Sequence, residues 1–310
     1  DNNIPTLGLG VIEDGKLTQI KVYGKLNDKT SASYNSLFNV ASLTKPVTVM
    51  TVLRLVSLGK WNPDEPLYKY FTDPDIAKDS RHKKLTTRMI LSHQTGFPNW
   101  CWMNKDNKLT FDFEPGTKYQ YSGEGFEYLR KAIEKKFNIT LEELAKEYVF
   151  QPLGMNDTSY VWNERKQAGR IVIGYDKDGK PYDIVKNKTA SAADDLTTSV
   201  EDYSQFLIAV MNNELLSPEV FDAMKTKQVK SKENKYFGLG FEIYDLGNDE
   251  IALSHGGADK GVNTFAIILP KTKQGLVIFT NVDDGYKIYE PIMNQYLGEK
   301  GKRIVEIETK

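Results

Sequence analysis

Hydrophobic and polar positions alternate at both ends of the chain, which is the pattern of β-strands. The N-terminal segment LGLGVIEDGKLTQIKVYGKL, residues 7–26, contains two such stretches around Asp14-Gly15, a dipeptide that favours a tight hairpin turn. In the last third, four short β-rich segments are separated by Gly, Asn, Asp and Pro, which predicts an antiparallel meander. These segments are residues 236–244, 251–257, 263–270 and 275–282.

Between the two ends, apolar residues recur every three to four positions, which is typical of amphipathic helices. Thr140 followed by Glu143 has the spacing of a helix-capping box, and Ser199 followed by Asp202 is an acidic variant of it. The helices predicted in this way span residues 43–58, 86–92, 125–137, 141–149, 200–211, 218–226 and 285–298.

The order of these elements predicts an α+β fold in which the N-terminal hairpin and the C-terminal strands join into one antiparallel sheet flanked by helices. They can join only if the helical middle of the chain is an insertion beside the sheet. We therefore expect a single domain over residues 1–310. Its α/β subdomain would comprise about 1–60 and 190–310, and its mostly helical subdomain about 61–189. Small-molecule sites prefer the clefts between such parts.

Composition and charge narrow the class of partner. The chain has 310 residues, is 40% hydrophobic and carries 41 Lys and Arg against 42 Asp and Glu, so its formal net charge is -1. The charges are interspersed, which argues against nucleic acid or an anionic membrane as a partner and favours a small molecule. No apolar run approaches the roughly 20 residues of a membrane span. The sequence gives no oligomeric state.

The first residue is Asp1, and no charged-then-apolar leader follows it. This start favours an exported bacterial protein, periplasmic or secreted, whose signal peptide has been removed. Trimming of a longer sequence would leave the same start.

The residues that bind metals best are sparse in this chain. The single cysteine, Cys101, excludes an intramolecular disulfide framework and argues against a cysteine-based metal site. The three histidines, His82, His93 and His255, have no metal-ligand spacing. We therefore expect neither a metal nor another cofactor.

The stretch NVASLTKPVT, residues 39–48, places Ser42 and Lys45 three residues apart at the start of an apolar segment. On a helix, residues three apart lie on one face, so the amine can reach the hydroxyl. Desolvation disfavours the charged form of a lysine, which lowers its pKa and makes it a base toward a serine. The alternative is a helix-capping serine followed by a solvated lysine, because Ser-x-x-Lys also recurs by chance.

A second polar stretch, EPGTKYQYSGEGFEYLRKAIE, places Tyr121, Ser122 and Gly123 in a loop before a predicted helix. A tyrosine beside a cationic amine ionises more easily and can take a proton. The alternative is an ordinary tyrosine whose ring packs in the protein. Glu124 either faces a cleft or begins the helix, and we favour the second.

The third stretch, LSHGGADKGVNTF, ends a predicted strand with His255, Gly256 and Gly257. Glycines at such a place let a ligand approach the backbone closely. The backbone N–H of Ala258 could join that of Ser42 in an oxyanion hole. The alternative is a glycine-rich hairpin turn with a surface histidine.

Taken together, an early Ser-x-x-Lys, a tyrosine loop in the helical middle and a late His-x-Gly resemble the serine β-lactamase and penicillin-binding-protein superfamily. The resemblance is strongest to its class C β-lactamase-like branch, which includes esterases, D-aminopeptidases and β-lactamase-related serine hydrolases. It extends over essentially the whole chain. Three further stretches fit this branch: LSHQTGFPNW (91–100), FQPLGMNDTSY (150–160) and LVIFTNV (276–282).

The resemblance implies roles for the residues of these motifs. Ser42 would be the acylated nucleophile, with Lys45 as its base partner. Tyr121 would complete the base system and give a proton to the leaving group, and the N–H groups of Ser42 and Ala258 would bind the oxyanion. The residues expected to contact the substrate are His255, Gly256, Gly257, Ser122 and Gly123. The implied reaction is acyl transfer to water through an acyl-enzyme, on small esters, amides or D-amino-acid peptides.

Two departures from the lactamase pattern affect the expected substrate. Gly123 replaces an asparagine whose amide grips the acylamide carbonyl of the substrate. His255 and Gly256 replace the Lys-Thr of the late triplet, and a histidine is neutral for much of the time near pH 7, which weakens the grip on a substrate carboxylate. Both changes argue against efficient β-lactam hydrolysis and suit an esterase, amidase or peptidase.

Other functions remain open from the sequence. The chain could be a β-lactamase, or a penicillin-binding sensor or other binding protein without turnover, although it retains Ser42, Lys45 and Tyr121. A Ser-His-Asp hydrolase would use His93 or His255, but the chain has no Gly-x-Ser-x-Gly elbow. We assign His93 to a structural turn, where its ring packs or caps. Aromatic residues expected in the pocket wall are Trp100, Trp102, Tyr160 and Trp162.

Overall fold

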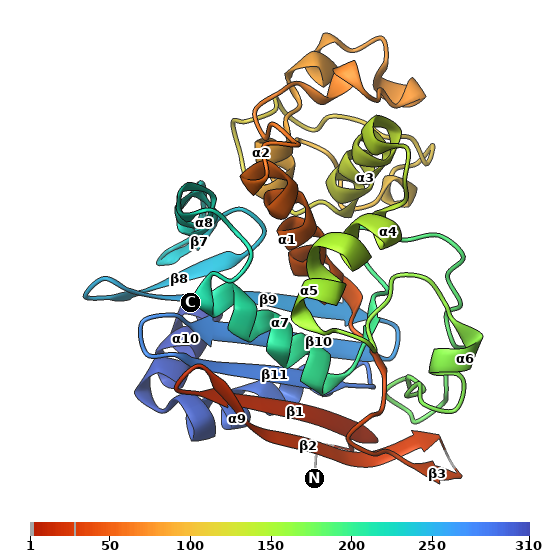
Figure 1. Ribbon diagram of the computed structural model, residues 1–310, viewed down its shortest axis with the longest axis vertical. Helices are drawn as coiled ribbons and strands as arrows, with labels where there is room; N and C mark the ends of the chain where they lie inside the picture. The colour runs from red at the N-terminus through yellow and green to blue at the C-terminus, as the bar shows by residue number, and fades with distance from the viewer. Residues whose placement is uncertain (1–2, 28) are drawn as a thin grey trace.

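The computed structural model describes residues 3–27 and 29–310, which form a sheet region and a helical region beside it (Figure 1). Nine strands of this part of the chain form one antiparallel sheet in the order β3-β2-β1-β11-β10-β9-β8-β7-β6. They are β1 (Thr6–Glu13), β2 (Lys16–Asn27), β3 (Thr30–Ser31), β6 (Val229–Lys232), β7 (Lys235–Phe237), β8 (Glu242–Gly247), β9 (Glu250–Asp259), β10 (Val262–Leu269) and β11 (Gln274–Thr280). A separate pair is formed by β4 (Phe38–Asn39) and β5 (Thr197–Thr198).

The N-terminal hairpin and the C-terminal meander meet where β1 pairs with β11, so the predicted fold class is confirmed. The hairpin turns at Asp14 and Gly15, whose φ angles of 52° and 72° belong to the tight turn that the Asp-Gly dipeptide predicts.

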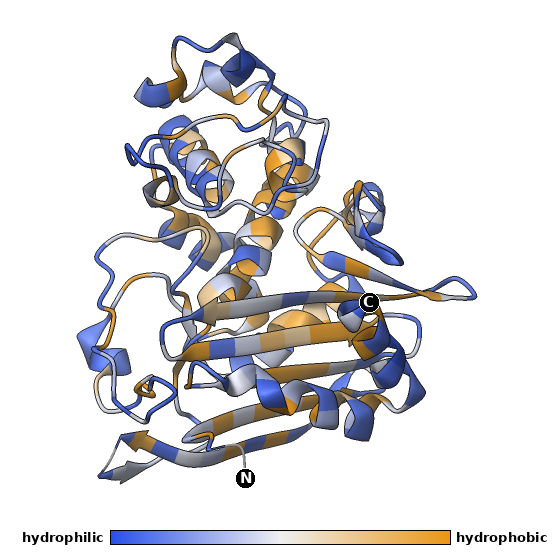
Figure 2. Cartoon of the chain, turned by 180° about the vertical axis from the view of Figure 1, so that it is seen from behind, coloured by the Kyte–Doolittle hydropathy of each residue, from blue (hydrophilic) through white to orange (hydrophobic). Residues whose placement is uncertain are grey.

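Helices cover both faces of the sheet. On one face, α7 (Val200–Asn212) packs against β1, β2, β10 and β11. On the other face, α9 (Tyr289–Leu297) and α10 (Glu299–Thr309) cover the strands, as Figure 2 shows from behind. Their apolar residues Met293, Leu297, Ile304 and Ile307 meet strand residues such as Leu9, Val11, Ile267 and Ile278 in one buried cluster.

Helix α1 (Thr44–Ser57) runs from the sheet into the helical region (Figure 1). Every residue from Thr44 to Leu53 is buried, which explains why its sequence is apolar on all sides rather than amphipathic. The remaining α-helices are α2 (Thr87–Leu91), α3 (Gly123–Phe137), α4 (Leu141–Ala145), α5 (Gln151–Leu153), α6 (Glu164–Gln167) and α8 (Pro218–Lys225). Short 3-10 helices are η1 (Ala41–Leu43), η2 (Leu67–Lys69), η3 (Pro74–Ile76), η4 (Ser80–Lys84), η5 (Cys101–Met103) and η7 (Gly285–Ile288), and η6 (Lys146–Phe150) is a π-helix.

Some predicted boundaries were wrong. The single strand predicted at 236–244 is two strands, β7 and β8, because Gly240 adopts a left-handed φ of 85° and its N–H bonds to Leu91 O in the helical region. The helix predicted at 141–149 passes from α4 into the π-helix η6, although the Thr140 capping box is present as predicted. The strands β3, β4, β5 and β6 and the helices α5, α6 and α10 were not among the predicted elements.

Within the described part of the chain, none of the helices combines the length and the apolar character that a bilayer crossing requires.

Candidate active site

Ser42 lies in η1, the short turn that joins β4 to α1, and not in the helix that was predicted from residue 43. The preceding residue, Ala41, has a φ of 46°, which is unusual for a residue other than glycine. Its N–H donates to Asn39 Oδ1 at 2.8 Å, and its carbonyl accepts from Thr44 Oγ1 at 2.6 Å. These side chains hold the backbone turn that presents Ser42.

Strand β9 lies directly against this turn at Gly257. A Cβ atom on Gly257 would be 2.5 Å from Val40 O and 3.1 Å from Ser42 N, so only glycine fits there. Thr264 of β10 holds the same turn, because its Oγ1 donates to Val40 O at 2.8 Å. The turn and the strand thus form one rigid unit at Ser42.

This contact predicts that Gly257→Ala destabilises the protein, because the added methyl group forces β9 away from the turn. We expect a loss of about 1–3 kcal/mol in the free energy of unfolding, the usual cost of overpacking. The neighbouring change Gly256→Ala is a matched control, because the nearest atom to its Cβ is Thr264 O at 3.9 Å. Thermal unfolding measures both, and equal melting temperatures would contradict the close contact.

Lys45 is fully enclosed by the protein and points at Ser42. Its side chain donates from Nζ to Ser42 Oγ at 3.0 Å and to Ala193 O at 2.8 Å, and the residue is only 1% exposed. Burial lowers the pKa of Lys45 to about 8, and the negative charges of Asp194 and Glu127 limit that fall. The alternative of a solvated lysine is therefore wrong.

Tyr121 completes this arrangement. Its hydroxyl is hydrogen-bonded to the Ser42 side chain, and Lys45 Nζ lies 4.7 Å from the centre of its ring. Burial raises the pKa of Tyr121 well above its ordinary value, and the bond to Ser42 does not offset that effect. The expectation that Tyr121 ionises easily was wrong, because burial outweighs the neighbouring amine.

The ring of His93 packs against the ring of Tyr121. The two ring centroids are 4.3 Å apart, and His93 Nδ1 accepts a hydrogen bond from Ser122 N at 3.1 Å. Burial lowers the pKa of His93 well below its ordinary value, with the charge of Lys45 as a smaller cause. His93 is thus a neutral packing residue, as predicted.

The two residues after Tyr121 contact other parts of the protein and do not line an open cleft. Ser122 is buried; its Oγ accepts from Gly125 N at 3.1 Å and donates to Pro98 O at 2.8 Å, so it caps α3. We correct the expectation that its side chain contacts a substrate. A Cβ atom on Gly123 would be 2.7 Å from the Trp100 ring, so this ring fills the space beside the loop.

The structure also places Glu124 and two of the aromatic residues that were named from the sequence. Glu124 is in the first turn of α3, as favoured, where its Oε1 accepts from Cys101 N at 2.9 Å. Tyr160 is 2% exposed and its hydroxyl bonds to Thr48 Oγ1 at 3.0 Å, so it belongs to the core and not to a pocket wall. Trp102 is 67% exposed.

His255 is buried beside Tyr121, with 6.1 Å between the ring centroids. Its Nδ1 lies 2.7 Å from Gly256 O, and because a carbonyl only accepts, Nδ1 carries the proton. Burial, followed by the charge of Lys45, lowers the pKa of His255 to about 3. His255 is therefore neutral near pH 7 and provides no cation at this place.

Strand β9 has an open edge after Ser254, the last residue that pairs with β8. Residues 255–259 pair only with β10, and Ala258 is exposed there, directly after Gly257. The oxyanion hole formed by the amides of Ser42 and Ala258 stays a prediction.

A cavity of about 450 Å³ opens beside Tyr121, His255 and Gly256. Its wall is largely apolar and comes from the sheet and from the two C-terminal helices α9 and α10. The apolar lining residues are Tyr244, Phe265, Tyr286, Tyr289, Met293, Ile304 and Val305, and the carboxylates are Glu242, Glu290 and Glu308. This volume suits a small organic group.

The loop at residues 191–195 was not predicted to belong to the site. It supplies Ala193 O to Lys45 and places Asp194 nearby, and burial together with the charge of Asp195 raises the pKa of Asp194. Oxygen atoms of Asp194, Asp195 and Asp259 lie within 4.8 Å of one another, which suits a hard cation by ligand type alone. No local sequence signal connects this loop with Ser42, which lies about 150 positions earlier.

Comparison with known proteins finds relatives along almost the whole chain. The β-lactamase family model matches residues 1–291. Protein flp of Staphylococcus aureus (strain MRSA252) is 24% identical over 96% of this chain, which spans 64% of the length of that protein. Penicillin-binding protein 4* of Bacillus subtilis (strain 168) is 23% identical over 87% of this chain and 66% of that protein.

Two solved structures share the fold. The octameric penicillin-binding protein homologue from Pyrococcus abyssi has a TM-score of 0.79 at 20% identity and covers 94% of this chain and 74% of its own. A penicillin binding protein from Bacillus halodurans has a TM-score of 0.79 at 20% identity, with 94% and 97% covered.

Proposed function

This chain belongs to the β-lactamase family, and we propose that it is a serine acyl hydrolase acting on small esters or amides, including D-amino-acid peptides. The observation that carries the proposal is the buried amine of Lys45, held 3.0 Å from Ser42 Oγ. A buried lysine with a pKa near 8 is neutral often enough at physiological pH to act as a base.

In the proposed reaction, neutral Lys45 takes the proton of Ser42 as Oγ attacks the substrate carbonyl carbon. The amides of Ser42 and Ala258 bind the oxyanion. Tyr121, whose raised pKa keeps it protonated, gives its proton to the leaving group as the carbonyl–heteroatom bond breaks. The Lys45 ammonium then reprotonates Tyr121, so one proton passes from Ser42 to the leaving group. Water attacks the acyl-enzyme through the same groups in reverse.

The surroundings of the site support substrates without a recognised carboxylate. His255 is neutral, so it cannot pair with the carboxylate of a β-lactam, and Glu242 and Glu308 line the adjacent cavity. Gly123 has no side-chain amide, and the Trp100 ring fills the space beside it. An apolar acyl or leaving group fits the cavity wall instead.

A penicillin-binding role is the second candidate, because several relatives carry that name. It requires acylation of Ser42 by a β-lactam, with slow release of the product.

A substrate panel separates these functions. We expect kcat/KM for p-nitrophenyl butyrate or D-alanyl p-nitroanilide to exceed that for nitrocefin by about 100-fold or more, because the lactam carboxylate lacks a cationic partner. Comparable turnover of nitrocefin would refute the weight given to Gly123 and His255. A stable mass increase on Ser42 after nitrocefin, without turnover of any ester or amide, would favour the penicillin-binding role.

A further inference from the structure

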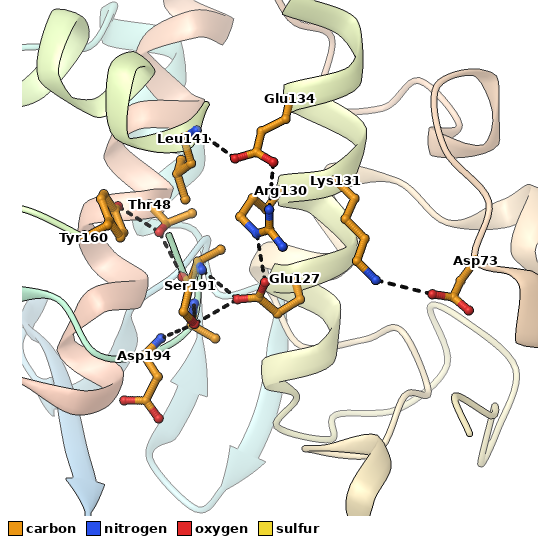
Figure 3. Close-up of polar contacts among 12 residues, drawn as sticks. Thr48, Asp73, Glu127, Arg130, Lys131, Glu134, Leu141, Tyr160, Ser191 and Asp194 are labelled. Atoms are coloured by element: carbon orange, nitrogen blue, oxygen red, sulfur yellow. Dashed lines mark hydrogen bonds and ion pairs between the residues drawn. The ribbon is translucent and has the colours of Figure 1, made fainter. Parts of the chain in front are cut away.

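Residues 191–194 form a short loop between α1 and α3, shown in Figure 3. From the side of α1, Thr48 Oγ1 donates to Ala192 O at 2.8 Å, and Lys45 Nζ donates to Ala193 O at 2.8 Å. Within the described residues, the second contact is one of the two hydrogen bonds of the Lys45 amine; the other is to Ser42 itself. The position of the Ala193 carbonyl therefore decides where the amine points.

From the side of α3, one carboxylate holds this loop. Glu127 Oε1 accepts from Ser191 Oγ at 2.9 Å and from Ala192 N at 2.7 Å. Ser191 Oγ in turn accepts from Ala193 N at 3.3 Å and from Asp194 N at 3.1 Å. Glu127 thus holds Ser191 and Ala192 directly, and through Ser191 Oγ it reaches the N–H of Asp194, which belongs to the peptide that carries the Ala193 carbonyl (Figure 3).

Glu127 is itself fixed within α3. Its Oε2 accepts from Arg130 Nε at 2.8 Å, and Arg130 Nη1 bonds to Glu134 Oε2 at 2.7 Å. The side chains of Glu127 and Arg130 are only 16% and 19% exposed, so solvent screens this pair weakly. A fixed, partly buried carboxylate is a rigid support for a loop.

We propose that Glu127 is a positioning residue for the Ser42–Lys45 pair: it holds the loop whose Ala193 carbonyl aims the Lys45 amine at Ser42. It does not touch the reacting atoms. This inference rests on the proposed serine acyl hydrolase function and adds a residue of α3 to the site.

The charge of Glu127 has a separate effect on Lys45. The titratable groups that face Lys45 are Asp194 in the loop, Glu127 on α3, Tyr121 before α3, His93 after α2 and His255 on β9. Of these, Asp194 and Glu127 raise the pKa of Lys45, against the burial that lowers it. Removal of the Glu127 charge should therefore lower this pKa, so the neutral amine persists to lower pH.

Three variants separate the support of the loop from the charge. Glu127→Ala removes both, and we expect it to lower the plateau kcat by about tenfold with little change in KM. Glu127→Gln keeps an acceptor for the loop and loses the charge, so it should keep most of the plateau while the acid limb of the kcat profile moves to lower pH. Ser191→Ala keeps the charge and loosens the loop, so it should lower the plateau without moving the limb.

Glu134→Gln is the matched control, because Glu134 shares Arg130 with Glu127 but does not contact the loop. It should keep the plateau and the limb of the wild type. NMR titration of lysine side chains labelled with ¹³C, with the Lys45 signal assigned by its loss in Lys45→Ala, reads the amine without turnover. It should show a lower pKa in Glu127→Gln than in Glu134→Gln.

Wild-type plateaus in Glu127→Ala and Ser191→Ala would overturn the positioning role while leaving the proposed function in place. An equal loss in Glu134→Gln, together with an equal fall in melting temperature, would overturn it as well, since the effect would then be one of general stability. A wild type that hydrolyses no ester or amide and is not labelled at Ser42 by a fluorophosphonate would overturn the proposed function and this inference together.

Discussion

Changing Ser42 to alanine should abolish covalent labelling by a fluorophosphonate probe and lower ester turnover by about 10⁴-fold or more. The expected size follows from the removal of a nucleophile whose partners act as a unit, since a base without a nucleophile contributes little. Intact-protein mass spectrometry should show one adduct on the wild type, and peptide mapping should place it at Ser42.

Ser57→Ala is a suitable control, because Ser57 is the last residue of α1, the helix that follows the turn of Ser42, and its Oγ donates to Leu53 O at 3.0 Å. This variant should be labelled like the wild type. Equal labelling of Ser42→Ala and the wild type would remove Ser42 from the role of nucleophile.

The parts of the fold that follow local rules could be predicted from the sequence. The turn at Asp14 and Gly15 needs only its own residue types, and alternating apolar residues need only a face to bury. The break between β7 and β8 could not be predicted in this way. It depends on Gly240, where any Cβ atom would meet Val49 of α1 at 2.2 Å, and α1 lies far away in the sequence.

Helix α10 was missed for a related reason. Its sequence is rich in charge, and only Gly301, Ile304 and Ile307 are buried, so its apolar stripe is narrow. This stripe predicts a helix only when it is already known that the face of the sheet opposite α7 must be covered.

In the candidate site, too, only the local pattern could be predicted from the sequence. The spacing of Ser42 and Lys45 is local, and so the pair could be named. The groups that set their chemistry are Ala193 and Glu127, which lie 148 and 82 residues from Lys45 in the sequence, as the numbering gives directly. The protonation of Tyr121 was predicted in the wrong direction, because burial cannot be read from a loop sequence.

Lys45 and Lys235 are both buried, but their hydrogen-bond and charge partners differ. Lys235 is also buried, but its Nζ pairs with Glu242 Oε1 at 2.8 Å and with Glu308. Burial alone would lower the pKa of Lys235, yet these carboxylates outweigh it and raise the pKa. Lys45 instead contacts a hydroxyl and a carbonyl, which are neutral acceptors. The difference lies in the partners and not in the depth of burial.

This contrast predicts opposite effects on stability for the same substitution. Lys45→Met should lower ester turnover by about 100-fold or more, because it removes the base. It should leave the melting temperature at pH 7 unchanged or higher. The shift of the Lys45 pKa from 10.5 to about 8 corresponds to about 3 kcal/mol against the charged form in the folded protein. The substitution relieves this cost, while the unpaired Ala193 carbonyl offsets part of the gain.

The pH dependence follows from the sign of that shift. Below pH 8 the Lys45 amine is charged in both the folded and the unfolded protein, and its burial lowers the free energy of unfolding. Between pH 8 and 10.5 the folded protein has released this proton while the unfolded chain still holds it. The contribution of Lys45 to stability therefore rises with pH over this range. The advantage of Lys45→Met should therefore be largest below pH 8 and shrink toward pH 10.5.

Lys235→Met is the matched control and should lower the free energy of unfolding by about 2 kcal/mol, because it leaves the partly buried Glu242 without its cation, whereas Glu308 keeps Lys232. Thermal unfolding across pH, with ester turnover at each pH, tests both variants. A Lys45→Met protein that melts as low as Lys235→Met would mean that the Lys45 amine is stabilised as a cation. Retained turnover would mean that Lys45 is not the base.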